Sequence, residues 1–398
     1  MSELQDSKPD LPSFSARLRD LAFLFLKLGT ISFGGPAAHI ALIEGEIVRK
    51  RQWVTKQQFL DMLGAANLIP GPTSTEMAIN VGFVRAGWAG LCVAGASFIL
   101  PAAFITGAFA WAYVRFGSLP QAASVLAGIK PAVLAVIAIA IWRLGKTAVR
   151  DLGLALLGGL SLAAFFLGLN PILILFGGGL LGMLARRMVS IRAAASVVIP
   201  MTLPWRAASA VGVLAVTAGT VVARPSIGRI ALFFLKVGAV LYGGGYVLLA
   251  FLEQGLVQQH AWLTRQQLLD AVAIGQFTPG PVLSTATFIG YILGGVPGAA
   301  VATVGIFLPS FFYVALLAPV LFRLRQSAWV AAFLDSVNVG AVALMAGVTF
   351  RLGVDALRGW SSGVIGALAL AVLMRWKVSP AWVVLGGGVA GLLLTGLR

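Results

Sequence analysis

Two short polar segments interrupt an otherwise apolar chain, and each carries the residue types of an anion-binding site. Residues 67–77 read NLIPGPTSTEM and residues 276–285 read QFTPGPVLST. Proline lacks a backbone N–H and clashes with the preceding helical turn, so each Pro-Gly-Pro should end one helix and start another. The free N–H groups at the start of the second helix, with the positive end of its dipole, favour an anion.

A pair of glycine-rich breaks precedes these segments, at 32–36 (SFGGP) and 241–245 (LYGGG). Glycine allows the backbone to approach a ligand closely. We predict that the breaks build an anion cradle near the membrane midplane; kinks that serve only helix packing are the alternative. The residues predicted to bind the anion are Gly34, Gly35, Pro70, Gly71, Pro72, Thr73, Ser74, Thr75, Gly243, Gly244, Pro279, Gly280, Pro281 and Ser284.

Three lysines lie in apolar segments, where an unpaired charge is costly and therefore marks a candidate functional group. Lys27 and Lys236 each stand seven residues, about two helical turns, before a glycine break. Lys130 precedes a proline within an apolar span and aligns with Asn338 in the internal repeat described below. We predict that these four residues belong to the anion site. The alternative is that the lysines extend their ammonium groups to the membrane surface.

Few carboxylates accompany these cations, so each is a candidate for carrying a coupling proton if burial stabilises its protonated form. The candidates are Glu44, Glu76, Glu253 and Asp335. Salt bridges to the lysines are the alternative role.

The segments WVTKQQFLD and WLTRQQLLD indicate structural roles. Thr55 and Thr264 are each followed three residues later by a glutamine, which is the capping-box pattern at a helix start. Asp61 and Asp270 are then predicted to be helix-surface or loop-pairing residues.

The composition indicates a polytopic membrane protein. Hydrophobic residues make up 59% of the chain and charged residues 11%, and long apolar runs recur from about residue 90 onward. The excess of Lys and Arg then orients membrane helices, and no nucleic-acid partner is expected. A single cysteine, Cys92, excludes an internal disulfide, and with two histidines it excludes a conventional zinc or iron–sulfur site. No cofactor is predicted, and the polar first residues are predicted to be a cytosolic tail.

The chain contains an internal repeat, because residues 24–72 align with 233–281 without a gap. Lys27, Gly34 and the whole Pro-Gly-Pro are identical in the two copies. We predict the following organisation: a tail at 1–16, a first repeat at 17–188, a linker at 189–227 with one span at about 206–224, and a second repeat at 228–396. The full spans are expected at about 90–114, 121–143, 152–168, 171–187, 298–320, 328–350, 357–375 and 378–396.

The single linker span would place the second repeat upside down relative to the first, which is a recurring arrangement in secondary transporters. With the N-terminus in the cytosol and the C-terminus outside, most of the 29 basic residues fall on the cytosolic side, as the positive-inside rule requires. The expected fold is therefore an all-α polytopic membrane protein of two inverted repeats with broken or re-entrant helices.

The combination of FGGP, WVTKQQFLD and IPGPTS, repeated as YGGG, WLTRQQLLD and TPGP, resembles the chromate transporter family in its long, two-domain form. The resemblance covers nearly the whole chain. It implies export of chromate from the cytosol across the bacterial inner membrane, driven by the membrane potential or the proton gradient, and chromate resistance. Sulfate, an isosteric dianion, is the natural competitor. The second copy departs from the pattern at Gly245, where the first has Pro36.

Two other activities share these motifs: import of sulfate or another oxyanion, and an anion channel. No nucleophile–base pair or phosphate loop indicates an enzyme. The expected partners are a small oxyanion and the lipid bilayer; the oligomeric state is left open, with a homodimer as one option.

Overall fold

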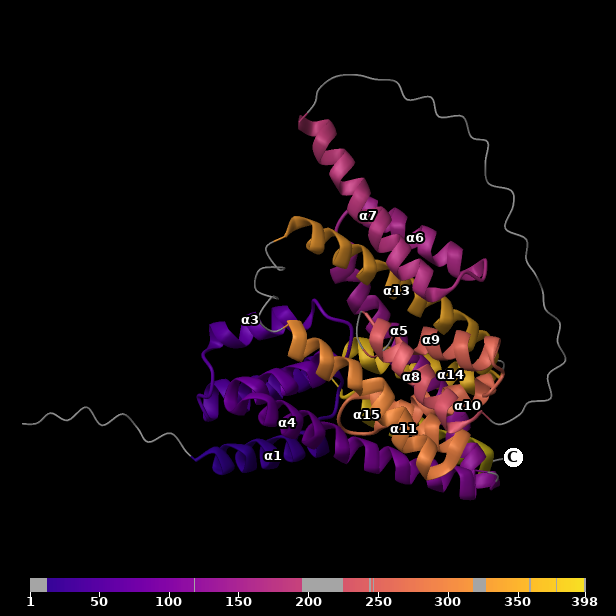
Figure 1. Cartoon of the computed structure of the whole chain (residues 1–398). Helices are drawn as coiled ribbons and strands as arrows, with labels where there is room; N and C mark the ends of the chain where they lie inside the picture. The colour runs from indigo at the N-terminus through magenta and orange to yellow at the C-terminus, as the bar shows by residue number, and fades with distance from the viewer. Residues whose placement is uncertain are drawn as a thin grey trace, which may run out of the picture.

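The computed structural model describes residues 13–194 and 225–396, apart from residues 118, 243–244, 246, 318–326, 358 and 377. Within these residues the chain is helical and contains no strand (Figure 1). The predicted linker span at 206–224 and the predicted site residues Gly243 and Gly244 lie outside the described residues.

The first repeat begins with helices separated by the two breaks and continues with four helices after the second break. Its elements are α1 (Phe14–Ile31), α2 (Pro36–Glu44), the π-helix η1 (Gly45–Lys50), α3 (Lys56–Ala66), α4 (Thr73–Phe116), α5 (Pro120–Ala148), α6 (Leu152–Phe166) and α7 (Pro171–Ala194).

The second repeat follows the same order. Its elements are α8 (Ile227–Val240), α9 (Leu248–Leu252), the π-helix η2 (Glu253–Gln259), α10 (Arg265–Phe277), the 3-10 turn η3 (Val282–Ser284), α11 (Thr285–Leu317), α13 (Ala328–Ala356), α14 (Trp360–Arg375) and α15 (Pro380–Gly396). Both copies thus contain two breaks followed by four longer helices, as the sequence predicts.

Local sequence determines where the broken helices begin. Pro72 is the N-cap of α4, so the helix restarts directly after the Pro-Gly-Pro. Thr55 and Thr264 cap α3 and α10 with the complete reciprocal hydrogen bonds of a capping box, as predicted. The long helices α4 and α11 each bend at a glycine with φ 61°, Gly87 and Gly295.

The two repeats are interleaved. Helix α4 packs along α11, α5 packs against α14 and α15, and α13 packs against α6 and α7. One long helix of each repeat, α5 or α13, therefore packs against the last two helices of the other repeat. The contact between α5 and α15 is close because Gly128 lies directly against the backbones of Gly387 and Gly391.

Among the described residues, four helical stretches are long and apolar enough to cross a membrane: Thr73–Phe116, Gln121–Ala148, Val282–Leu316 and Ala328–Ala356. Four shorter apolar helices accompany them, at Leu152–Phe166, Pro171–Ala185, Trp360–Arg375 and Pro380–Leu394. Many large apolar side chains remain exposed on these helices, among them Leu156, Phe104 and Leu368, as expected of surfaces that face lipid. The protein is thus an all-α polytopic membrane protein built from two repeats.

Candidate functional site

A cavity of about 700 Å³ lies beside the breaks of the first repeat. Its walls bring together residues that are distant in the sequence, from α2, α3, the start of α4, the end of α5 and the start of α13. The predicted site residues on its wall are Gly34, Gly71, Thr73 and Asn338, together with the predicted coupling residue Asp335. The cavity therefore combines both breaks of one repeat with a helix of the other.

The backbone around this cavity requires glycine. Gly34, Gly35 and Gly71 have φ values of 105°, 80° and 146°, which residues with a side chain rarely adopt. The first turn of α4 begins at Thr73, whose hydroxyl donates to Asn67 Oδ1 at 3.4 Å. Because the first N–H groups of a helix have no acceptor within the helix, this turn offers donors beside the cavity.

The cavity also contains a cation that the sequence interpretation missed. Arg143 and Arg150, near the end of α5, both line it. Arg150 Nη1 lies 3.5 Å from Asp335 Oδ1 and is thereby neutralised, whereas Arg143 has no ion pair within the described part of the chain. The sequence contains a signal for Arg143, because WRLG at 142 recurs as FRLG at 350, but this repeat alone does not distinguish an anion-binding residue from a charge that orients the helix.

Glu76 lies directly behind the cavity wall. It is completely buried in the first turns of α4, and neither carboxyl oxygen has a hydrogen-bond partner. A Cβ added at Gly71 would contact Glu76 Oε1 and Ser310 Oγ, so this carboxyl packs against the glycine that lines the cavity. An unpaired buried carboxylate is very costly, which marks Glu76 as a candidate functional group. Ser74 and Thr75 are buried in the same turn, facing away from solvent.

The second Pro-Gly-Pro is closed by protein. Gly280 donates its N–H to Ser32 O at 2.8 Å, and its Cα packs against Ala102. Ser284 accepts a hydrogen bond from Thr106 at 3.2 Å, and both side chains are buried. Pro279 and Pro281 flank Gly280 on either side. The two halves thus differ: the first break opens to a cavity, and the second packs against the first repeat.

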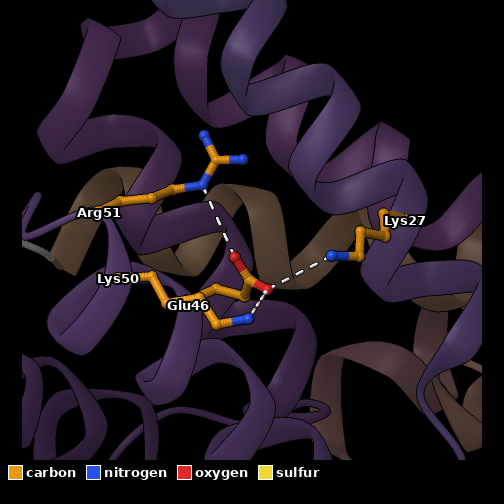
Figure 2. A network of polar contacts seen from close by, with 4 residues as sticks. All are labelled: Lys27, Glu46, Lys50 and Arg51. Carbon is orange, nitrogen blue, oxygen red and sulfur yellow. Dashed lines mark hydrogen bonds and ion pairs between the residues drawn. The ribbon is translucent and has the colours of Figure 1, made fainter.

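The three membrane lysines lie in separate environments. Lys130 on α5 forms a buried ion pair with Asp270 on α10, at 3.0 Å, and Tyr113 donates to the other oxygen of the same carboxylate at 2.9 Å. The prediction that Asp270 is a helix-surface residue is therefore wrong, because its side chain is only 2% exposed. Lys27 lies 3.4 Å from Glu46 (Figure 2), and Lys236 lines a second cavity. None of the three lysines lines the cavity at the first break.

The other candidate coupling carboxylates have partners, which are arginines and a glutamine rather than the lysines considered above. Glu44 lies 3.5 Å from Arg49. The buried Glu253 accepts from Gln258 at 2.7 Å and lies 3.7 Å from Arg265. Among the four carboxylates, Glu76 alone combines complete burial with two unpartnered oxygens in the described structure.

We expect Gly71→Ala to abolish most transport while the protein still reaches the membrane. The new Cβ would overlap the Glu76 carboxyl and Ser310, and a φ of 146° is strained for alanine; strain and overpacking together cost roughly 1–3 kcal/mol. The control is Gly87→Ala, which also has a positive φ but meets no atom within 4 Å. The measurement is chromate uptake per unit of membrane-inserted protein. Equal rates in the two variants would show that the space at Gly71 is not needed.

Comparisons with known proteins agree with this architecture. The family model described as chromate transporter matches the chain twice, at residues 19–183 and 228–392. A chromate transport protein of Cupriavidus metallidurans is 32% identical, over 94% of this chain and 93% of that protein. A probable chromate transport protein of Synechococcus elongatus is 32% identical, over 92% and 91% respectively. An uncharacterized transporter of Methanocaldococcus jannaschii is 28% identical, over 89% and 88%. No solved structure matches. The chain therefore belongs to the chromate transporter family.

Proposed function

We propose that the protein exports chromate from the cytosol across the bacterial inner membrane, and that it thereby confers chromate resistance. The observation that carries this proposal is the cavity at the first break, which is lined both by the start of α4 and by Arg143, an arginine without an ion pair among the described residues. A guanidinium and free backbone N–H groups are strong ligands for a tetrahedral oxyanion. The similar proteins named for chromate transport supply the identity of that oxyanion.

The cavity is proposed to open toward the cytosol. Its charged residues lie near the end of α5, next to the loop that leads to α6, and this region carries Arg143, Lys146 and Arg150 within eight residues. Basic loops remain on the cytosolic side of the membrane. The N-terminus is then cytosolic and the C-terminus outside, and the cavity represents the state that receives an anion from the cytosol.

Glu76 is proposed to carry the coupling proton. Its carboxyl packs against Gly71 on the cavity wall and has no hydrogen-bond partner or ion pair among the described residues. Loss of its proton would place a negative charge behind the anion site and weaken anion binding, so proton and anion would move in the same direction, and the membrane potential would drive export of the dianion. Import of sulfate and passive conduction would use the same cavity, but the closed packing of Gly280 supports a transporter that opens one side at a time.

The test uses everted membrane vesicles, whose cytosolic face points outward. We expect radiolabelled chromate to enter them when the gradients are imposed, to stop when the coupling gradient is dissipated, and to be slowed by sulfate. Glu76→Gln should transport chromate at a rate that no longer responds to the proton gradient. Uptake only in right-side-out vesicles would contradict export and indicate import. Chromate flux through the native protein that does not depend on a gradient would indicate a channel.

The same vesicles test the orientation. In a Cys92→Ala background, a cysteine at Lys50 should react with an impermeant maleimide added outside the everted vesicles. A cysteine at Gln259, the equivalent position of the second repeat, should react only after the membrane is permeabilised. Reaction of both positions from the same side would contradict the inverted arrangement of the repeats.

A further inference from the structure

A second cavity, of about 370 Å³, lies between α8, η2 and the start of α7. It shares no lining residue with the cavity at the first break. Its polar wall consists of Asn170, Arg229, Lys236, Gln254, Gln259 and His260, and no carboxylate lines it. The cavity is therefore cationic and rich in hydrogen-bond donors.

The equivalent place in the first repeat shows what this cavity lacks. There the Glu46 carboxylate forms ion pairs with three cations, Lys27 at 3.4 Å, Lys50 at 2.9 Å and Arg51 at 3.8 Å (Figure 2). Lys50 beside it, the strongest of these contacts, lowers the pKa of the Glu46 carboxyl below its ordinary value. The first repeat thus supplies its own negative charge at this place.

The second repeat keeps the lysine and loses the acids. Lys236 aligns with Lys27, whereas the position of Glu46 is taken by Gly255 and that of Asp20 by Arg229. Neither Lys236 nor Arg229 forms an ion pair among the residues that the structure describes. Arg229 and Lys236 stand about two helical turns apart on α8, and an anion bound in the cavity that both line would offset their like charge.

Aromatic side chains form part of the remaining, apolar wall. His260 stacks on Trp262 with ring centroids 4.5 Å apart, and Phe233 lies edge-on to both rings. Gln254 reaches across to the loop between α6 and α7, where its amide donates to Leu169 O at 3.5 Å. Rigid apolar walls lower the local dielectric and strengthen charge-assisted hydrogen bonds to a ligand. The cavity thus combines two exposed cationic side chains with an aromatic wall.

We propose that this second cavity binds a tetrahedral oxyanion group, with Lys236 and Arg229 as its charged ligands and the surrounding amides as donors. The group is either a free dianion in solution or the phosphate of an anionic lipid, since both present the same oxygens. The proposal concerns a site separate from the cavity of Arg143, and it holds whichever way the protein transports its substrate.

A reporter cysteine in the pocket tests the proposal in the purified full chain. Gln259→Cys in a Cys92→Ala background should react with a neutral maleimide, and sulfate in lipid-free detergent should slow that reaction relative to chloride at equal ionic strength. Lys236→Gln and Arg229→Gln, both at exposed side chains, should each weaken the sulfate effect roughly tenfold. Gln254→Glu, which adds a carboxylate without changing size, should abolish it.

Two further measurements distinguish a free dianion from a lipid phosphate and provide the control. If a lipid phosphate is the ligand, phosphatidylglycerol nanodiscs will slow the reaction and sulfate will not. A cysteine at Lys50 in the first repeat, beside Glu46, should show no protection by sulfate or by lipid. The proposal is overturned if neither sulfate nor phosphatidylglycerol slows the reaction of Gln259→Cys with the maleimide. It is also overturned if adding Lys236→Gln or Arg229→Gln leaves this protection as strong as in the Gln259→Cys protein itself.

Discussion

Arg143→Gln should lower chromate transport by about one to two orders of magnitude, because hydrogen bonds to a charged group contribute about 1.5–3 kcal/mol. Arg143 is the guanidinium of the first cavity that has no carboxylate partner in the described structure, whereas Arg150 is held by Asp335. Arg143→Lys should retain part of the activity, since the charge remains while the planar donor fork is lost. The measurement is the initial rate of chromate uptake into everted vesicles over a range of concentrations.

The repeat itself offers the matched control. Arg351 is the equivalent arginine, and its guanidinium stacks over Phe165 at 4.4 Å instead of entering the cavity. Arg351→Gln should therefore leave the affinity for chromate close to that of the native protein. If both arginine variants lose transport equally, the effect belongs to the folding of the repeats and not to anion binding.

Lys130→Gln should destabilise the protein by about 3–5 kcal/mol, which is the usual cost of leaving one partner of a buried ion pair without its counterion. The Lys130 and Asp270 side chains are 7% and 2% exposed, so water cannot solvate the carboxylate that remains. Lys50→Gln is the control, because that lysine is 69% exposed in its pair with Glu46 and should cost about 1 kcal/mol or less. Thermal unfolding in detergent measures both effects.

The double variant separates the two roles considered for Lys130. Lys130→Gln with Asp270→Asn leaves two neutral amides, and Tyr113 can still donate to the amide oxygen that replaces the carboxylate. We expect this variant to recover most of the lost stability, because neutral replacements of a buried pair are often tolerated. If it is stable but fails to transport chromate, Lys130 contributes charge to the substrate. If it remains as unstable as the single variant, the pair is not the source of the destabilisation.

Local patterns predicted the parts of the fold that short segments determine. The start of α4 after the Pro-Gly-Pro and the capping box of Thr55 with Gln58 each depend on a few neighbouring residues, and both were recognisable in the sequence. The family was recognisable for the same reason, since its motifs are these local breaks.

Tertiary partners could not be predicted in this way. Lys130 meets Asp270 because α5 of one repeat lies beside α10 of the other, and no periodicity within either helix indicates that neighbour. Arg143 could not be recognised as a site residue because its side of the cavity is formed by α13, which follows far along the chain. A position-by-position comparison of the two repeats reveals further differences in charge, since the replacement of Glu46 by Gly255 is visible in the sequence.

The exchange of long helices between the repeats also affects how the chain acquires its structure during synthesis. Helix α5 leaves the ribosome long before α14 and α15, the helices against which it packs. Until α14 and α15 have been inserted, one face of α5 therefore contacts lipid instead of protein. Contacts between distant segments form late and slowly. Truncating the last two helices would thus leave the first half of the protein unfinished, although its own sequence would be intact.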